Sequence, residues 1–338
     1  MQRLEQRSLA SGDVGLSVLG FGAATLGNLY SEMTDADAEA AVQAALESGV
    51  TYFDTAPSYG FGLSEMRLGR ALAGRPRTAY SLSTKVGRRV EIDATVTQEV
   101  NEGFAVSGRR TSFDYSRDGV RRSFDESLQR LKVNYIDILL LHDIGRYTHG
   151  EHHIEVLRQA LDEALPAMVE LRDSGVVGAI GIGVNEQAVC LDVMRRFTLD
   201  CIMLAGRYTL LEQHGAVDVM REAQRRDVKV IVAGPYNSGL LAAASGPGAT
   251  YNYHAADSAV LERARKIYAV CAVDSIDVGA AALQLPLAHP AVVSVVAGQR
   301  SAQEVLTAVR RLEARIPASL WEHLRAAGLL ETSTTVPS

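Results

Sequence analysis

The sequence predicts an α/β fold of the (β/α)8, or TIM, barrel type, and two observations lead to this prediction. Short apolar segments alternate along the chain with segments of helical periodicity, the order expected for a parallel sheet covered by helices. No G-x-G-x-x-G motif follows the first apolar segment, which weakens the alternative of an open doubly wound sheet. No linker divides the 338 residues, so we expect a single domain over residues 1–338 with its core at about 15–315.

Eight segments are predicted to form the strands of the barrel. Each is continuously apolar rather than alternating, as expected for strands buried on both faces of a parallel sheet. In chain order the predicted strands are 17–24, 51–56, 80–86, 136–142, 179–184, 201–206, 229–234 and 292–298.

At least eight helices are expected between these strands, and seven of them have a clear pattern. The first, over 35–49, is expected to end with Gly49 as its C′ residue. The second, over 64–74, is expected to begin with Ser64 as N-cap and to end at Gly74. The other five are predicted over 116–132, 156–175, 185–197, 210–227 and 301–314.

Three long loops are expected at 87–116, 143–154 and 235–256, after the third, fourth and seventh strands. All three lie on the side of the barrel where the strands end, whereas the turns on the opposite side are short. Active sites of barrels are built at the carboxyl ends of the strands, and long loops in compact domains are usually lids or binding loops. The sequence therefore predicts a site at this end.

Composition excludes several classes of function. A net charge of -6 without a basic cluster argues against a nucleic-acid partner. Cys190, Cys201 and Cys271 lie in apolar patterns without metal-ligand spacing and are expected to be reduced thiols. No apolar run approaches the roughly 20 residues of a membrane helix, and the N-terminus lacks the apolar core of a signal peptide. We expect a cytoplasmic protein.

Polar side chains stand where three successive predicted strands end. Asp54 ends the second strand, Lys85 lies near the end of the third and His142 ends the fourth, while Tyr59 follows the second. In a barrel these positions converge, so Lys85 can pair with Asp54. Lys85 beside Tyr59 is also expected to lower the tyrosine pKa, which would suit proton transfer with a substrate oxygen oriented by His142.

The string HGEHH, at 149–153, raises the alternative of a metal site. Its spacing does not match a helical pair of histidine ligands, and a polar loop is the expected structure. No metal is predicted. Tyr147 and His149 from this loop are predicted instead to contact the substrate.

The motifs YFDTAPSYG, STKVGR, IDILLLHD and AIGIGVN resemble those of the aldo-keto reductase superfamily, and the resemblance covers roughly residues 15–315. It implies a catalytic tetrad of Asp54, Tyr59, Lys85 and His142. It also implies hydride exchange with a nicotinamide cofactor bound without a Rossmann fold.

The strings LLHDIGRYTHGE, LAGRYTLLEQ and GPYNSGLL resemble a narrower group, the aldose 1-dehydrogenases acting on L-fucose, L-galactose or D-arabinose and the pyridoxal 4-dehydrogenases. The expected activity is NAD-dependent oxidation of a cyclic hemiacetal to a lactone, at C1 of an aldose. Alternatives are oxidation of pyridoxal to its 4-lactone and NADPH-dependent reduction of aldehydes or ketones. Two other classes stay open: a non-catalytic, cofactor-sensing subunit and a metal-assisted hydrolase.

The cofactor is expected to lie on the loops after the seventh and eighth strands, where barrels often bind phosphate. The family resemblance adds an asparagine after the fifth strand. Three alanines, Ala205, Ala233 and Ala308, stand where the family often has a glutamine, a tyrosine and an asparagine. The predicted contacts are Asn185, Gly234, Pro235, Asn237, Ser238, Gly239, Leu240, Gly298, Gln299, Arg300 and Glu304.

NAD is expected rather than NADP. Gly298 and Glu304 occupy the positions where NADP-preferring relatives have basic residues, although Arg300 offers a positive charge nearby. The expected partner is a small-molecule substrate, a sugar or pyridoxal, with neither nucleic acid nor membrane. The sequence does not decide the oligomeric state.

Overall fold

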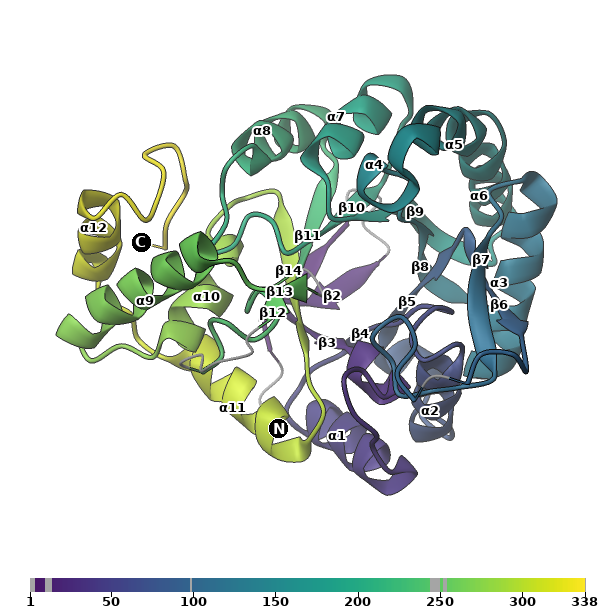
Figure 1. Cartoon of the computed structure of the whole chain (residues 1–338), viewed down its shortest axis with the longest axis horizontal. Coiled ribbons are helices and arrows are strands. Elements are labelled where there is room, and N and C mark those ends of the chain that lie inside the picture. Colours follow the sequence, from purple (N-terminus) through teal and green to yellow (C-terminus); the bar gives the residue numbers. More distant parts are fainter. Residues whose placement is uncertain (1–3, 10–13, 98, 244–249, 252–253, 338) are drawn as a thin grey trace.

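The computed structural model describes residues 4–9, 14–97, 99–243, 250–251 and 254–337, and a closed barrel of eight parallel strands lies at its centre (Figure 1). Each strand pairs with the next one in the chain, and the last pairs with the first. The strands are β3 (Leu19–Gly22), β4 (Tyr52–Asp54), β5 (Ser81–Val86), β8 (Ile136–His142), β9 (Val177–Val184), β10 (Cys201–Ala205), β11 (Lys229–Ala233) and β14 (Val292–Gly298). These are the eight predicted segments, and the predicted barrel is confirmed.

The barrel is closed where its strands begin. β1 (Gln6–Ser8) and β2 (Gly15–Ser17) form an antiparallel hairpin, and the Gly15 carbonyl accepts a hydrogen bond from Ser81 at the start of β5, at 2.7 Å. Leu16 of this hairpin packs with Tyr52, Ile138 and other apolar side chains inside the barrel. The cavity of the barrel is therefore filled, and its open end is the one where the strands stop.

Helices surround the barrel, and a side chain caps several of them. Thr34, Ser116 and Ser301 each accept a hydrogen bond from a backbone N–H in the first turn of the helix that follows. All seven predicted helices are present. The outer helices are α1 (Asp35–Glu47), α2 (Leu63–Ala71), α3 (Arg117–Leu131), α5 (His153–Gln159), α6 (Leu165–Asp173), α7 (Gln187–Arg196), α8 (Ala216–Arg226), α10 (Val278–Leu287) and α11 (Ala302–Glu313).

Three predicted helix boundaries were wrong. α2 begins after Gly62, and Ser64 is a buried residue inside it whose hydroxyl donates to the Ala23 carbonyl at 2.6 Å. α8 begins only after Gly215, whose φ of +75° interrupts the helical pattern that precedes it. The helix predicted over 156–175 starts earlier, at His153, and contains a π turn just before Pro166, which has no N–H to donate.

Besides the short α4 (Arg146–His149), three longer helices were not predicted: α9 (Ser258–Val273), α10 and α12 (Ala318–Ala326). α10 is buried almost all round, so it shows no polar face from which a helical period could be recognised. α9 and α12 form a second core with Trp321 at one side of the barrel. Within the described ranges, no single helix is long and apolar enough to cross a membrane. α9 and α10 reach that length and apolar composition only when taken together, and a bend of 99° separates them.

The long loops lie at the open end of the barrel, as predicted. The first contains a hairpin of β6 (Arg88–Ile92) and β7 (Arg109–Phe113), and the second contains α4 (Arg146–His149) and a 3-10 turn. The third contains β12 (Thr250–Tyr251) and β13 (His254–Ala255), and part of this loop falls outside the described residues. The three cysteines are buried and form no disulfide.

Candidate active site

A buried ion pair joins the ends of β4 and β5. Lys85 Nζ donates to both carboxylate oxygens of Asp54, at 2.8 and 3.0 Å, and to the carbonyl of Thr55 at 2.9 Å. All three ammonium protons are therefore used. A charge at a buried strand end needs such a partner, and the predicted pairing of Asp54 with Lys85 is present.

Two further side chains hold the Asp54 carboxylate from inside the barrel. Ser83 donates to Asp54 Oδ1 at 2.6 Å, and the hydroxyls of Ser83 and Tyr52 lie 2.9 Å apart. Both side chains are buried. The sequence analysis missed them, although both have polar groups within strands that are otherwise apolar, and such groups need partners.

The turn after β4 carries Tyr59 over this pair. Lys85 Nζ lies 4.7 Å from the centre of the Tyr59 ring. The turn lies close against the segment that follows β3: a Cβ on Gly60, whose φ is +60°, would fall 2.3 Å from the Gly27 carbonyl oxygen. The Tyr59 hydroxyl makes no hydrogen bond to any residue that the structure describes, so it is available to a ligand.

The expected lowering of the Tyr59 pKa is wrong for the protein without cofactor. Burial raises the pKa of Tyr59 well above 10, the negative charges of Asp54 and Asp143 raise it further, and only Arg88 opposes them. Because Asp54 binds Lys85 directly, the pair presents little net positive charge to the tyrosine. A phenol in this setting is protonated at neutral pH.

His142 ends β8 next to Tyr59, with the two rings 6.1 Å apart and nearly perpendicular. Burial lowers the pKa of His142 to about 3, Lys85 and Arg88 lower it as well, and Asp143 opposes them. The imidazole is therefore neutral. Its Nε2 lies 3.5 Å from Asp143 Oδ2, while Nδ1 is buried and has no partner among the described residues. We assign the proton to Nε2, which faces the carboxylate.

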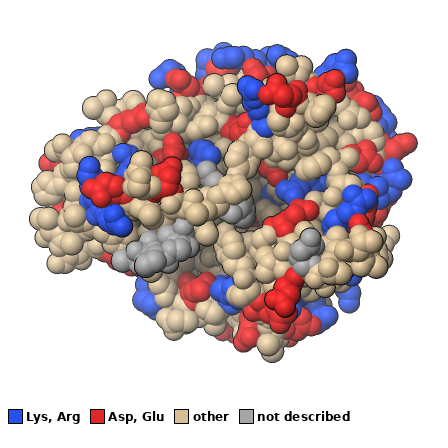
Figure 2. Space-filling model, in the orientation of Figure 1, with Lys and Arg blue, Asp and Glu red and all other residues tan. Residues whose placement is uncertain are grey.

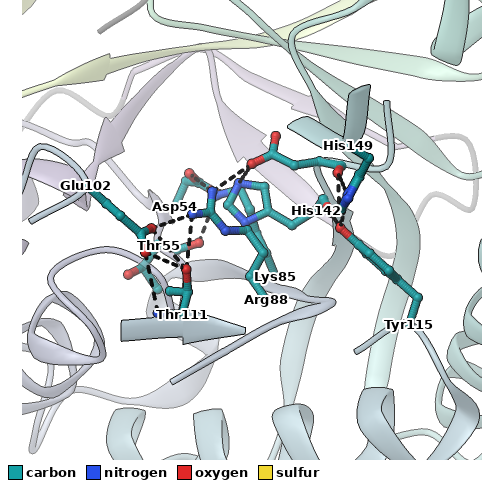
Figure 3. A network of polar contacts seen from close by, with 10 residues as sticks. Asp54, Thr55, Lys85, Arg88, Glu102, Thr111, Tyr115, His142 and His149 are labelled. Carbon is teal, nitrogen blue, oxygen red and sulfur yellow. Dashed lines mark hydrogen bonds and ion pairs between the residues drawn. The ribbon is translucent and has the colours of Figure 1, made fainter. Parts of the chain in front are cut away.

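A polar network surrounds His142 (Figure 3). Arg88 donates to Asp143 Oδ2 at 2.9 Å and to Glu102 Oε2 at 2.7 Å, and Thr111 also binds Glu102. This network links the β6–β7 hairpin to the end of β8. The sequence analysis did not predict it, although Arg88 and Asp143 are the last residues of the motifs STKVGR and IDILLLHD.

On the other side of His142, the Tyr115 hydroxyl donates toward the carbonyl oxygens of His142 and Asp143, at 2.9 and 3.0 Å (Figure 3). His149 Nε2 lies 2.8 Å from the same Asp143 carbonyl. The predicted substrate contact His149 thus already holds the backbone with Nε2. Tyr147 is half exposed on α4. Substrate binding by these two residues stays a prediction.

The loop after β11 has backbone N–H groups that find no acceptor among the described residues. Asn237, Ser238 and Gly239 all have positive φ, at 47°, 58° and 91°. No described residue accepts a hydrogen bond from the N–H of Ser238 or Gly239. Successive N–H groups of this kind form a concave site for anions. Nearby, Asn237 Nδ2 donates to the Gly206 carbonyl at 3.1 Å, while its Oδ1 is buried without a partner in the described part of the chain.

The segment 28–33 touches both sides of the open end. Asn28 and Tyr30 exchange hydrogen bonds with the backbone of residues 103–105, beside the β6–β7 hairpin. On the side of the predicted cofactor residues, Arg300 donates to the carbonyls of Leu29 and Glu32, at 3.4 and 3.2 Å. Figure 2 shows this face hollowed near its centre, with charged side chains around the hollow.

The sequence pattern of the aldo/keto reductase family matches residues 18–328. The chain belongs to this family. It is 39% identical to the pyridoxal 4-dehydrogenase of Microbacterium luteolum, over 96% of this chain and 98% of that one. It is 36% identical to the D-threo-aldose 1-dehydrogenase of a Pseudomonas species, over 98% and 100%. Among solved structures, an aldo-keto reductase from Bacillus halodurans in its holo form is 28% identical, with 99% of both chains covered and a TM-score of 0.75.

As an aldo/keto reductase, the protein is an NAD(P)-dependent oxidoreductase. Its residues fit a nicotinamide dinucleotide. The free N–H groups of Ser238 and Gly239 suit a pyrophosphate, and both amide atoms of the buried Gln299 side chain lack partners among the described residues. Asn185 follows β9 and its carboxamide makes no hydrogen bond within the described ranges. Arg207, which follows β10, adds a positive charge that the sequence analysis missed.

Two of the predicted cofactor residues have local partners in this aldo/keto reductase. The Glu304 carboxylate accepts a hydrogen bond from the Arg300 backbone N–H at 2.9 Å, and the Glu304 N–H donates to the N-cap side chain of Ser301, so Glu304 takes part in capping the start of α11. The Arg300 side chain is directed to the carbonyls of segment 28–33. Within the described residues, no group of three His, Cys, Asp or Glu side chains is placed to hold a metal ion.

Proposed function

We propose that this aldo/keto reductase is an NAD-dependent dehydrogenase that oxidises the cyclic hemiacetal of an aldose at C1 to a lactone. One observation carries the proposal. A tyrosine hydroxyl with no hydrogen bond to any described residue and a neutral histidine lie side by side above a buried Lys85–Asp54 pair, at the open end of the barrel. The D-threo-aldose 1-dehydrogenase relative, matched over its full length, supports the substrate class.

In this proposal the hemiacetal hydroxyl lies between Tyr59 and His142. Tyr59, ionised as a phenolate that Lys85 stabilises, accepts the hydroxyl proton and becomes a neutral phenol. Asp54 holds Lys85 in place, and His142 donates Nε2–H to the same oxygen. When bound, the oxidised nicotinamide supplies the acceptor for the hydride that leaves the same carbon, while the carbon–oxygen single bond becomes the lactone carbonyl.

The choice of NAD rests on the start of α11. NADP carries a 2′-phosphate, and sites that prefer it supply Lys or Arg. Here the exposed Glu304 carboxylate lies at this end of the helix and would repel a phosphate. Arg300, the competing cation, is turned toward the carbonyls of Leu29 and Glu32.

Pyridoxal is the second candidate substrate, because the pyridoxal 4-dehydrogenase of Microbacterium luteolum is 39% identical to this chain. Pyridoxal also closes to a hemiacetal, so the same groups would serve its oxidation to a lactone. A panel of L-fucose, L-galactose, D-arabinose and pyridoxal, each assayed with NAD and NADP by absorbance of the reduced nicotinamide, tests the proposal. We expect the highest kcat/KM for an aldose with NAD.

Failure of every substrate in this panel to reduce either cofactor would overturn the dehydrogenase proposal. If the inactive protein still bound NAD, that result would favour the cofactor-sensing subunit. If it oxidised NADPH when aldehydes were added, it would favour a carbonyl reductase. A metal-assisted hydrolase would lose activity with a chelator, whereas the dehydrogenase is expected to keep it.

A further inference from the structure

Asp143, the residue after His142, has an oxygen that the protein does not use. Its side-chain contacts, to Arg88 at 2.9 Å and to His142 at 3.5 Å, both involve Oδ2. Within the described part of the chain, Oδ1 has no hydrogen-bond partner, and the side chain is 17% exposed. An accessible carboxylate oxygen without a partner beside a catalytic histidine is a candidate contact for substrate.

The position of this carboxylate is fixed from several sides. Asp143 has a φ of +51°, a left-handed conformation that aspartate tolerates better than most residues. Its N–H donates to the Gly183 carbonyl at 3.0 Å, and its own carbonyl is bound by Tyr115 and His149. The carboxylate is thus held before any ligand arrives, and little freedom would be lost on binding.

Arg88 compensates the negative charge of Asp143 but contacts only one of its two carboxylate oxygens. The guanidinium also binds Glu102, so it carries two carboxylates, and the cluster of three is net negative. Such a cluster accepts hydrogen bonds well and disfavours an anion. It suits a neutral hydroxyl, which can donate to Oδ1.

We propose that Asp143 accepts a hydrogen bond from the substrate hydroxyl on the carbon next to the reacting carbon. The reacting oxygen is bound by His142, and Asp143 Oδ2 lies 3.5 Å from Nε2 of that histidine, so the neighbouring hydroxyl falls beside the carboxylate. The subsite then selects hemiacetals that carry a 1,2-diol, the ring form of a 2-hydroxy aldose. This inference rests on the proposed function and narrows its substrate class.

The subsite also acts against other hemiacetals. A substrate with an apolar group next to the reacting carbon would leave Asp143 Oδ1 desolvated and without a hydrogen-bond donor. The hemiacetal of pyridoxal carries an acidic ring hydroxyl near its reacting carbon, and the ionised form would be repelled. Asp143 therefore disfavours the second candidate substrate.

The experiment compares D-arabinose with 2-deoxy-D-ribose, or L-fucose with 2-deoxy-L-fucose, at saturating NAD. Wild-type enzyme is expected to show kcat/KM about 10- to 100-fold higher for the 2-hydroxy sugar, the range for a hydrogen bond to a charged group. Asp143→Ala is expected to bring this ratio close to one, because the loss falls on the 2-hydroxy sugar. Arg88 keeps Glu102 as partner in this variant. Should Asp143→Ala fail to fold, the isosteric Asp143→Asn is expected to reduce the ratio several-fold.

Asp137→Asn is the matched control, since Asp137 also lies on β8 and also pairs with an arginine, but at the closed end. Its ratio between the two sugars is expected to equal that of wild type. Equal losses for both sugars in Asp143→Ala would mean that Asp143 acts only through His142, which overturns the inference and leaves the proposed dehydrogenase intact. A wild-type enzyme that reduces NAD with no sugar of either pair, and with no other aldose of the panel, overturns both.

Discussion

The two ends of β8 carry the same chemical pair in different settings. At the closed end, Asp137 binds Arg77 and also accepts a hydrogen bond from the backbone N–H of Leu82 on the neighbouring strand, at 2.7 Å. At the open end, Asp143 binds Arg88, but among the described residues its carboxylate contacts only side chains. The two carboxylates are about equally exposed, at 14% and 17%. Burial therefore does not distinguish them.

The closed end repeats its arrangement on another pair of strands. Asp200 accepts a hydrogen bond from the N–H of Ile180 at 2.8 Å and pairs with Arg172 from the outer layer. Here an aspartate joins two strands and an arginine compensates its charge. We infer that an ion pair stabilises the fold when its carboxylate also satisfies a backbone group, as Asp137 and Asp200 do. An ion pair without that role can serve a ligand.

The largest effect expected from this comparison is on turnover at the open end. Tyr59→Phe should reduce kcat by about 10²–10⁴-fold, the usual contribution of a general acid–base group. Cofactor affinity and unfolding free energy should stay near wild type, within about 0.5 kcal/mol, because the lost hydroxyl has no partner among the described residues. Steady-state kinetics and cofactor titration measure this.

Tyr80→Phe, which removes a hydroxyl near the closed end, is the control and should keep wild-type turnover. A Tyr59→Phe enzyme with the same kcat as wild type would remove Tyr59 from the mechanism.

The second prediction compares how much Asp137 and Asp143 contribute to the free energy of unfolding. Asp137→Ala should lower the free energy of unfolding by about 2–3 kcal/mol, since it leaves a buried backbone N–H and an arginine without their acceptor. Asp143→Ala should cost only about 0–1 kcal/mol, as for an ion pair without such a role. Urea unfolding of both variants tests this, and equal losses would contradict the distinction between the two ends.

The pH dependence of oxidation probes the open end alone. Because the pKa of Tyr59 lies well above 10, its ionised fraction grows tenfold with each pH unit below that value. The rate of hemiacetal oxidation should therefore rise from pH 6 to pH 10 by up to about tenfold per unit. The raised pKa weakens the folded state only above about pH 10, so stability should not change with Tyr59 across this range. A flat rate, with hydride transfer shown by an isotope effect to be limiting, would contradict it.

The smallest effect concerns the cofactor side of the open end. Glu304→Arg should shift the ratio of kcat/KM for NADP over NAD toward NADP by about tenfold, or about 1.4 kcal/mol. Glu304→Gln removes the charge but keeps a side chain able to accept from Arg300, so it separates charge from helix capping. Glu313→Arg, at the far end of the same helix, is the control. An unchanged ratio of kcat/KM for NADP over NAD in Glu304→Arg would mean that the 2′ position of the ribose does not lie beside residue 304.

The sequence predicted what depends on strand order. Once eight buried strands are recognised, Asp54, Lys85 and His142 must meet at one end, and they do. It could not predict effects that depend on distances. Lys85 was expected to lower the pKa of Tyr59, but Asp54 lies close enough to cancel its charge. Ser64 was expected to cap α2, but Gly62 starts the helix and the serine is buried.

Side chains on the long loops were also beyond prediction. Arg88 meets Asp143 only because the β6–β7 hairpin folds back over the barrel, and hydrophobic periodicity does not report where a polar hairpin lies. Tyr115 reaches the backbone of His142 because Gly87 leaves room; a Cβ there would be 2.4 Å from the tyrosine ring. α10 was missed for a different reason. It is buried almost all round, so its sequence has no polar face from which a helical period could be recognised.

Segment 28–33 has a consequence for loop grafting in enzyme engineering. The hairpin region that borders His142 and Arg300, one of the predicted cofactor residues, are both bonded to this one short stretch of chain. The barrel's loops are thus not independent modules. A designer who transplants 87–116 from another barrel to change substrate scope has to bring the matching 28–33 as well, or the graft will also alter how the enzyme holds its cofactor.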